Sequence, residues 1–143
     1  MITEIITTGT ELLLGEITNE NSQWLAQFLN EHGFTVAYMT TVGDNRERMK
    51  EALEVALGRA QLVITSGGLG STQGDITKEV GAKVMGLPFV CVEEEVKRLR
   101  AYYEGKGRTY LPSLERQAWF AKGSHILPND AGSAAGAVVE GAG

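Results

Sequence analysis

Hydrophobic and polar positions alternate along the first half of the chain in a pattern that predicts strands separated by helices. Apolar, β-branched runs predict strands over residues 4–8, 34–42 and 62–66. Between them, apolar residues recur at helical spacing over residues 19–32 and 46–58. Strand, helix, strand, helix, strand in this order predicts an α/β protein with a parallel sheet and helices on both of its faces.

The first of these helices carries aromatic residues on its apolar face. Asn19 can cap its start, and Gly33 is expected to end it. Trp24 and Phe28 stand four positions apart on the same stripe as Leu25 and Leu29. Because this is the spacing of a buried helical face, we expect the two aromatic rings to lie in the core and not to form a ligand platform.

The second half of the chain is less regular. We expect a helix over about 77–85, a strand around Cys91, and a helix from Glu93 through Tyr103. A further helix is expected after Pro112 with Ser113 as its cap, and a strand over 137–140. We found no internal repeat and no linker, so the prediction is a single domain over residues 1–143.

Composition and charge narrow the class of protein. A hydrophobic content of 43% and a charged content of 22% are ordinary for a globular chain. Thirteen basic and eighteen acidic residues give a net charge of −5, and no basic patch that would bind nucleic acid directly is evident. The single cysteine, Cys91, excludes an internal disulfide, and its apolar setting favours a buried residue over a nucleophile. No apolar run approaches the length of a membrane span, so we expect a cytoplasmic protein.

The most informative stretch is the third strand and the loop that follows it. The strand over 62–66 leads into a loop rich in glycine and hydroxyl side chains, and a helical pattern follows. Such a loop lets backbone N–H groups converge on an anion, so we predict a phosphate site. It has neither the lysine of a Walker loop nor the third glycine of a dinucleotide fingerprint. The residues expected to bind are Ser66, Gly67, Gly68, Gly70, Ser71 and Thr72.

Three loops follow the carboxyl ends of predicted parallel strands, where ligands bind in such sheets. Besides the glycine-rich loop, these are the segments Gly9-Thr10-Glu11 and Gly43-Asp44-Asn45. Taken alone, Asp75 could cap the next helix and Asp44 could form a turn. Because the loops should share one edge, we expect both carboxylates to bind a magnesium-like ion that contacts the phosphate. Asp44 and Asp75 are therefore the expected metal ligands and the expected catalytic residues. Gly9, Thr10, Glu11 and Asn45 are the other expected ligand-binding residues of these two loops.

A second glycine-rich turn runs from Asn129 through Gly132, and we include these two residues among the expected ligand contacts. His32 and His125 stand in neither metal nor triad spacing and are expected to be structural. No Gly-x-Ser-x-Gly motif occurs, which makes covalent hydrolysis the weaker enzyme hypothesis.

Five sequence blocks together resemble the amino-terminal domain of the competence/damage-inducible CinA proteins, in the superfamily that includes molybdopterin adenylyltransferases. The resemblance runs in order over nearly the whole chain. The blocks are residues 8–15, 41–45, 67–72, 75–79 and 127–129.

The resemblance implies a three-layer α/β/α fold with a mostly parallel sheet, like a molybdopterin-binding domain, and a homo-oligomer, either a dimer or a trimer. It implies that Asp44 and Asp75 are the important carboxylates, and that Gly67, Gly68, Gly70 and Thr72 hold phosphate. It also implies metal-dependent hydrolysis of ADP-ribose to AMP and ribose 5-phosphate, with Mg²⁺, Mn²⁺ or Co²⁺ as the cofactor and molybdopterin as a possible ligand.

The chain departs from the family pattern at three places. Ser71 stands where relatives usually have proline, and Gly74 stands where they usually have a second acid. Relatives also continue past residue 143 into a strand and a Pro-Gly-x-Pro turn, so we expect this domain to lack that part. These departures keep two alternatives open, a molybdopterin- or nucleotide-binding domain without hydrolysis and a non-catalytic oligomerisation domain of a larger protein.

Overall fold

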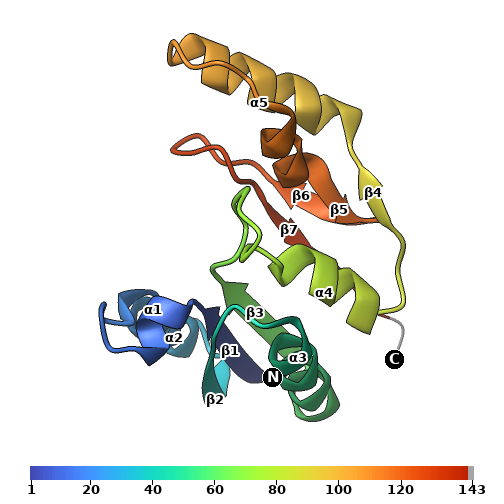
Figure 1. Ribbon diagram of the computed structural model, residues 1–143. Helices are drawn as coiled ribbons and strands as arrows, with labels where there is room; N and C mark the ends of the chain where they lie inside the picture. Colours follow the sequence, from blue (N-terminus) through green and yellow to red (C-terminus); the bar gives the residue numbers. More distant parts are fainter. Residues whose placement is uncertain (142–143) are drawn as a thin grey trace. The chain divides into compact units, whose positions relative to one another are not determined.

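A computed structural model describes residues 1–141, so the last two positions of the predicted 1–143 domain lie outside the described residues. The chain divides into two compact units, one covering Met1–Gly68 and one that begins at Leu69. Each unit has its own strands, helices and core. Figure 1 shows the elements of both units along the chain.

The first unit is built on a three-stranded parallel sheet with the order β2-β1-β3. Its strands are β1 (Ile2–Thr8), β2 (Thr35–Val42) and β3 (Leu62–Ser66). The central strand β1 is buried on both faces, and Ile5 and Ile6 are fully enclosed. A run of consecutive apolar residues suits such a strand because neither face meets water.

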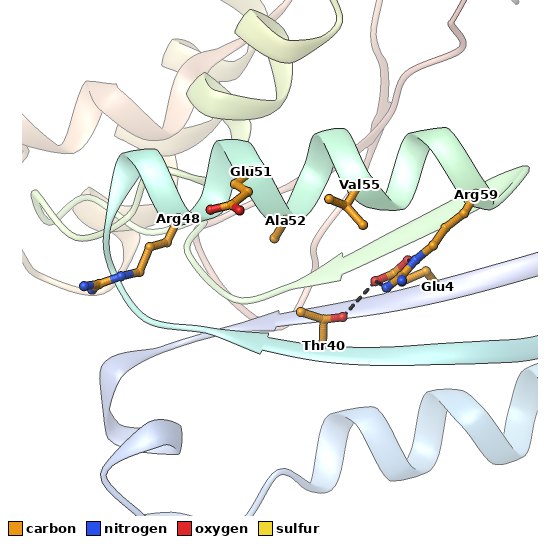
Figure 2. A pocket seen from close by; sticks show the side chains of 7 residues that line it. All are labelled: Glu4, Thr40, Arg48, Glu51, Ala52, Val55 and Arg59. Atoms are coloured by element: carbon orange, nitrogen blue, oxygen red, sulfur yellow. Dashed lines mark hydrogen bonds and ion pairs between the residues drawn. The ribbon is translucent and has the colours of Figure 1, made fainter.

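Helices cover both faces of this sheet. The short helix α1 (Thr10–Leu13) and helix α2 (Glu20–Glu31) follow β1, and helix α3 (Arg46–Arg59) connects β2 to β3. Figure 2 shows α3 above the strands and α2 below them. The first unit therefore has the predicted three layers, and its elements agree with the hydrophobic pattern except at α1, where a loop was expected.

The packing of α2 differs from the prediction. Asn19 caps the helix as expected, because its side chain accepts a hydrogen bond from the Ser22 N–H at 3.3 Å. Trp24, however, is 60% exposed and Phe28 is 43% exposed, and the two rings stack at 5.1 Å. The prediction that both rings lie in the core was wrong for the described chain. Helical spacing shows which residues share a face, but it does not show what covers that face.

The described part of the second unit, residues 69–141, contains two antiparallel pairs of strands and two α-helices. Helix α4 (Thr77–Val84) leads to strand β4 (Phe89–Cys91), and helix α5 (Glu93–Gly105) follows. A 3₁₀ helix, η1 (Pro112–Ala118), leads into β5 (Trp119–Ala121), which pairs with β4. Strand β6 (His125–Leu127) pairs with β7 (Gly136–Val138).

Helix α5 and η1 form the apolar core of this unit. Val96, Leu99, Tyr103 and Ala118 are buried together, and Cys91 packs against them. Burial raises the pKa of the Cys91 thiol, and the neighbouring Glu115 carboxylate raises it further. Since a thiol in this setting stays protonated, Cys91 fits the expected structural role. Ser113 was wrongly predicted as a cap, because η1 begins after Leu111 and has no side-chain cap.

Candidate functional site

The loops after β1 and β2 meet at the carboxyl edge of the first unit's sheet. Thr10 Oγ1 donates a hydrogen bond to Asp44 Oδ2 at 3.3 Å and lies 3.2 Å from the Asp44 N–H, which donates to it. Glu11 folds back over Gly9, where an added Cβ would lie 2.6 Å from Glu11 Oε1. The structure therefore brings Thr10 and Asp44 together, as expected from the parallel strand order.

Asn45 has a local structural task. Its side-chain oxygen accepts the Arg48 N–H at 3.0 Å and caps helix α3. An N-cap side chain satisfies one of the free N–H groups of the first helical turn. The Asn45 side chain, which directly follows Asp44, is therefore occupied by the cap of α3.

A pocket of about 320 Å³ lies within the first unit, between the end of β1, the loop before α2 and the end of β3. Two asparagines organise its wall. Asn19 Nδ2 donates to Thr7 Oγ1 at 2.8 Å, and Asn21 Nδ2 donates to Ser66 Oγ at 3.3 Å. The residues that line the pocket are Thr7, Thr8, Glu11, Leu12, Ile17, Thr18, Asn19, Glu20, Asn21, Ser66 and Gly67.

Of this lining, Glu11, Ser66 and Gly67 were predicted, whereas Thr7 and Asn21 were missed. Two carboxylates, hydroxyls and amides dominate the wall, and the lining contains no lysine or arginine. Such a wall suits the hydroxyl and amide groups of a sugar or a ring system better than a phosphate.

Thr8 and Gly67 form the closest backbone approach at this pocket. Gly67 has φ of +100°, and a Cβ there would lie 2.5 Å from the Thr8 carbonyl oxygen. Glycine is therefore required for both conformation and space. The Thr8 hydroxyl is buried and has no hydrogen-bond partner among the described residues. A buried hydroxyl without a partner is costly, so a bound group that reached Thr8 Oγ1 would be stabilised there.

The glycine-rich loop continues into the second unit, where Asp75 closes it. Asp75 Oδ2 accepts hydrogen bonds from the Thr72 N–H at 3.0 Å and from Thr72 Oγ1 at 2.7 Å. A Cβ at Gly70 would lie 2.6 Å from the same oxygen. The interpretation of Asp75 as a helix cap was wrong, because α4 begins after Ile76 and has no side-chain cap. Asp75 instead sets the shape of the predicted phosphate loop.

The turn after β6 is organised by Asn129. Its Oδ1 accepts the N–H groups of Ala131 and Gly132 at 2.9 and 3.0 Å, and its Nδ2 donates to Ala134 O at 2.7 Å. Gly132 leaves room for this side chain, since a Cβ there would lie 3.2 Å from Asn129 Nδ2. Asn129 and Gly132 thus lie together in one tight turn of the second unit.

The acidic side chains of residues 1–141 do not form a ready metal centre. Within that range no group of three or more His, Cys, Asp and Glu side chains is placed to hold an ion. Asp44 lies in the first unit and Asp75 in the second. Each carboxylate is held by a threonine hydroxyl through Oδ2, so each can offer its other oxygen to a cation.

A second pocket in the first unit surrounds a buried ion pair. Glu4 is 1% exposed, and Arg59 binds it through Nε and Nη2, both at 2.9 Å, while Thr40 Oγ1 donates at 2.7 Å. Figure 2 shows these side chains converging between α3 and the strands. The Arg59 guanidinium lowers the pKa of Glu4 below 4.5, and it also lies 3.6 Å from the centre of the Tyr38 ring. Because the charge is matched internally, this cluster is structural.

The fold and these loops define a domain of the molybdopterin-binding type. The chain belongs to the family described as "Probable molybdopterin binding domain", whose model matches residues 4–142. Within that family it is a CinA-like domain, as its relatives show.

A CinA-like protein of Dictyoglomus thermophilum is 47% identical over 137 residues, which is 96% of this chain and 33% of the relative. The crystal structure of CinA from Thermoplasma acidophilum, whose function is given as unknown, is 30% identical. It aligns with a TM-score of 0.88 over 96% of this chain and 80% of the other. The molybdopterin biosynthesis Mog protein of Mycobacterium ulcerans is 26% identical with a TM-score of 0.54, over 83% of this chain and 80% of the other.

The chain thus spans about a third of the length of the curated relatives it matches. Among its described residues, the helices are all too short or too polar to cross a lipid bilayer.

Proposed function

We propose that the domain is a metal-dependent pyrophosphatase that hydrolyses ADP-ribose-like dinucleotides to AMP and ribose 5-phosphate. The observation that carries the proposal is the glycine-rich loop after β3. Gly67 and Gly68 have φ values of +100° and +70°, so this part of the loop presents backbone without side chains. The buried Thr8 hydroxyl, which has no partner within residues 1–141, stands directly beside Gly67. Backbone N–H groups and a hydroxyl donor are the groups that bind phosphate oxygens.

The polar pocket of the first unit supports a nucleotide or a pterin as the ligand. Its asparagine and threonine side chains can exchange hydrogen bonds with ribose hydroxyls or with the edge of a ring. Its Glu11 and Glu20 carboxylates disfavour a phosphate within the same pocket. We therefore assign the sugar or ring to the part of this pocket lined by Glu11, Asn19 and Asn21, and the diphosphate to the glycine-rich loop, which begins at Gly67 beside Thr8.

Asp44 and Asp75 are each a proposed ligand for divalent ions, Mg²⁺, Mn²⁺ or Co²⁺. A divalent ion bound there would supply positive charge to the diphosphate and lower the pKa of water. The hydroxyls of Thr10 and Thr72 hold the two carboxylates in orientation without neutralising them. In the net reaction one water molecule is consumed, its oxygen joins one phosphorus, and the bridging oxygen leaves with the other phosphate.

The test is incubation of the purified protein with ADP-ribose and each of the three metals, with AMP measured by chromatography. We expect AMP to form, and we expect Asp44→Asn and Asp75→Asn each to reduce its rate at least about 100-fold, as for the loss of a charged catalytic group. Glu54→Gln is the matched control, because its side chain is 55% exposed on α3 and makes only a 4.0 Å contact with Lys50. Equal rates in all four proteins would overturn the proposal.

Binding without hydrolysis is the second candidate, and the lack of a three-donor cluster in residues 1–141 favours it. Ser71, in place of the usual proline, makes the loop less rigid than the family pattern, and Gly74 removes one of its two acids. Calorimetry with AMP and with molybdopterin separates the two candidates. Tight binding together with no AMP formation from ADP-ribose would establish the binding function.

We further propose that the protein acts as a homo-oligomer, a dimer or a trimer, in the cytoplasm. The exposed and stacked rings of Trp24 and Phe28 support self-association, because large exposed apolar side chains often mark interfaces. Light scattering coupled to size-exclusion chromatography measures the mass directly. A protein that stays at 15.4 kDa at all concentrations would contradict self-association.

A further inference from the structure

A buried glutamine connects three separate segments of the second unit. Gln117 is 1% exposed at the end of η1. Its Nε2 donates to Tyr103 Oη at 3.0 Å, and its Oε1 accepts from Ser133 Oγ at 2.7 Å. Its backbone carbonyl accepts from Lys78 Nζ at 2.9 Å. One residue thereby links α5, α4 and the turn after β6.

The turn after β6 is held at Ser133 by two separate contacts. The Ser133 hydroxyl donates to Gln117, and its carbonyl oxygen accepts Arg98 Nη2 at 2.6 Å. Arg98 is itself oriented by Glu95, whose Oε2 accepts its Nε at 2.9 Å. Ser133 directly follows Gly132 in the turn that Asn129 organises. The position of the turn is therefore set from the interior of the unit.

Lys78 connects Gln117 to the start of helix α4. It is the second residue of α4, three positions after Asp75, and its Nζ lies 3.9 Å from the centre of the Phe120 ring. The bond from Lys78 Nζ to the Gln117 carbonyl fixes the first turn of α4 against η1. Since Asp75 and Thr72 are joined by local hydrogen bonds just before α4, their place in the unit depends on that turn.

We propose that Gln117 is a positioning residue for ligand binding, which holds the turn at 129–134 through Ser133 and the start of α4 through Lys78. The inference rests on the proposed function, because it assigns these segments of the second unit to the binding of a phosphorylated ligand. Gln117 touches no ligand itself. It acts by keeping Asp75 on one side and Asn129 on the other in a fixed arrangement.

A purely structural role at position 117 would not need a hydrogen-bonding amide side chain. The neighbouring core residues Leu99 and Ala118 are fully buried and apolar, and a third apolar side chain would pack there without a hydrogen-bonding requirement. A buried amide that is satisfied in a network instead selects one arrangement of the groups it binds. The amide binds Ser133 in the turn that carries Asn129 and Gly132, and the backbone carbonyl of Gln117 binds Lys78, three positions after Asp75.

The experiment compares Ser133→Ala with Ser124→Ala. Ser124 is the matched control, because it is a serine of the same unit whose hydroxyl makes a local hydrogen bond of 2.6 Å to the Ala121 carbonyl, outside the network. AMP affinity is measured by calorimetry, and exchange of the Ala131 and Gly132 amide hydrogens is measured without ligand. We expect Ser133→Ala to weaken AMP binding about five-fold, the effect of losing one buried hydrogen bond, and to speed exchange of both amides. Ser124→Ala should match the wild type in both measurements.

A Ser133→Ala protein with the affinity and amide exchange of Ser124→Ala would overturn the inference. A variant that melts at a lower temperature but keeps the wild-type affinity would also overturn it, because that result shows a purely structural role. Gln117→Met is the second variant, and it should weaken AMP binding more than Ser133→Ala because it removes both side-chain connections.

Failure of the proposed function gives a different result. If the wild-type protein neither binds AMP nor hydrolyses ADP-ribose, the proposed function fails. Amide exchange then tests only the contact within the unit: faster exchange at Ala131 and Gly132 in Ser133→Ala shows that the Gln117 network holds the turn, and unchanged exchange refutes that contact as well.

Discussion

Lys78 should make the stability of the second unit rise with pH, which is the reverse of the usual effect of a surface lysine. Burial lowers the pKa of its ammonium group from 10.5 to about 8; the Glu95 carboxylate opposes this change, and the Arg98 guanidinium adds to it. The hydrogen bond to the Gln117 carbonyl at 2.9 Å and the Phe120 ring at 3.9 Å account for its place in the interior. The perturbation we choose is Lys78→Met, which keeps most of the length of the unbranched side chain and removes its charge.

The sign follows from proton binding in the two states. Below pH 8, Lys78 is charged in both the folded and the unfolded protein, so the cost of burying the charge is present in full. Between pH 8 and 10.5 the folded protein releases the proton while the unfolded chain keeps it, so the free energy of unfolding rises with pH. The two pKa values set an upper limit of about 3.4 kcal/mol, and partial solvent screening reduces the expected gain to about 1–2 kcal/mol.

The assay is urea unfolding at pH 7, 8, 9 and 10, with fluorescence of Trp119 as the signal. The chain has two tryptophans, Trp24 in the first unit and Trp119 in the second, so a Trp24→Phe background makes the signal specific for the second unit. Lys83→Met is the control, because Lys83 is an exposed residue in the last turn of the same helix. Comparing variants at each pH cancels the titration of all other groups.

We expect the wild type to gain about 1–2 kcal/mol relative to Lys78→Met between pH 7 and pH 10. Relative to Lys83→Met, the wild type should show no comparable gain. Parallel pH curves for the wild type and both lysine variants would refute the reasoning, because they would show that Lys78 has the same pKa in the folded and unfolded chains.

Three further substitutions test the first unit. Gly67→Ala should lower its stability by about 2 kcal/mol or more, measured by thermal unfolding, because the φ of +100° and the Thr8 carbonyl leave no room for a Cβ; an unchanged melting temperature would contradict this. Asn19→Ala should cost about 1 kcal/mol in urea unfolding through loss of the α2 cap, and a glycine at this position should cost less. Arg59→Met should cost about 2 kcal/mol at pH 7 by leaving the buried Glu4 carboxylate without its partner. Because Arg59 lowers the pKa of Glu4 in the wild type, that difference should shrink as the pH falls below 4.5, and a difference that stayed constant would show that the pair does not titrate as described.

The sequence predicted the first unit well because its signals are long and regular. Strands of five to eight residues and helices of twelve and fourteen give a clear hydrophobic period. Strands β5 and β6 were not predicted, whereas β4 and β7, which also have only three residues each, were expected from the apolar residues at their positions. The exposure of Trp24 could not be predicted from the sequence either, because helical spacing shows which residues share a face and not what packs against that face.

At the candidate site, local contacts were more predictable than distant ones. The glycines of the loop after β3 were recognisable from composition, and Gly67 does adopt a conformation that favours glycine. The expected metal-binding role of Asp75 stays a prediction, whereas the alternative of a helix cap is wrong, because a hydroxyl three residues earlier binds the same carboxylate. The bond between Asn19 and Thr7 could not be predicted, since it depends on how α2 packs on β1.

Four acids of this chain are held in two different ways, and the difference shows which of them can serve a ligand. Glu4 and Glu95 are each bound by an arginine at 2.9 Å, so their negative charge is matched within the protein. Asp44 and Asp75 are each held by a threonine hydroxyl through Oδ2. A hydroxyl fixes the direction of a carboxylate but leaves its charge in place. The two threonine-held aspartates therefore retain the charge that a divalent cation requires, whereas the two arginine-bound glutamates stabilise the fold.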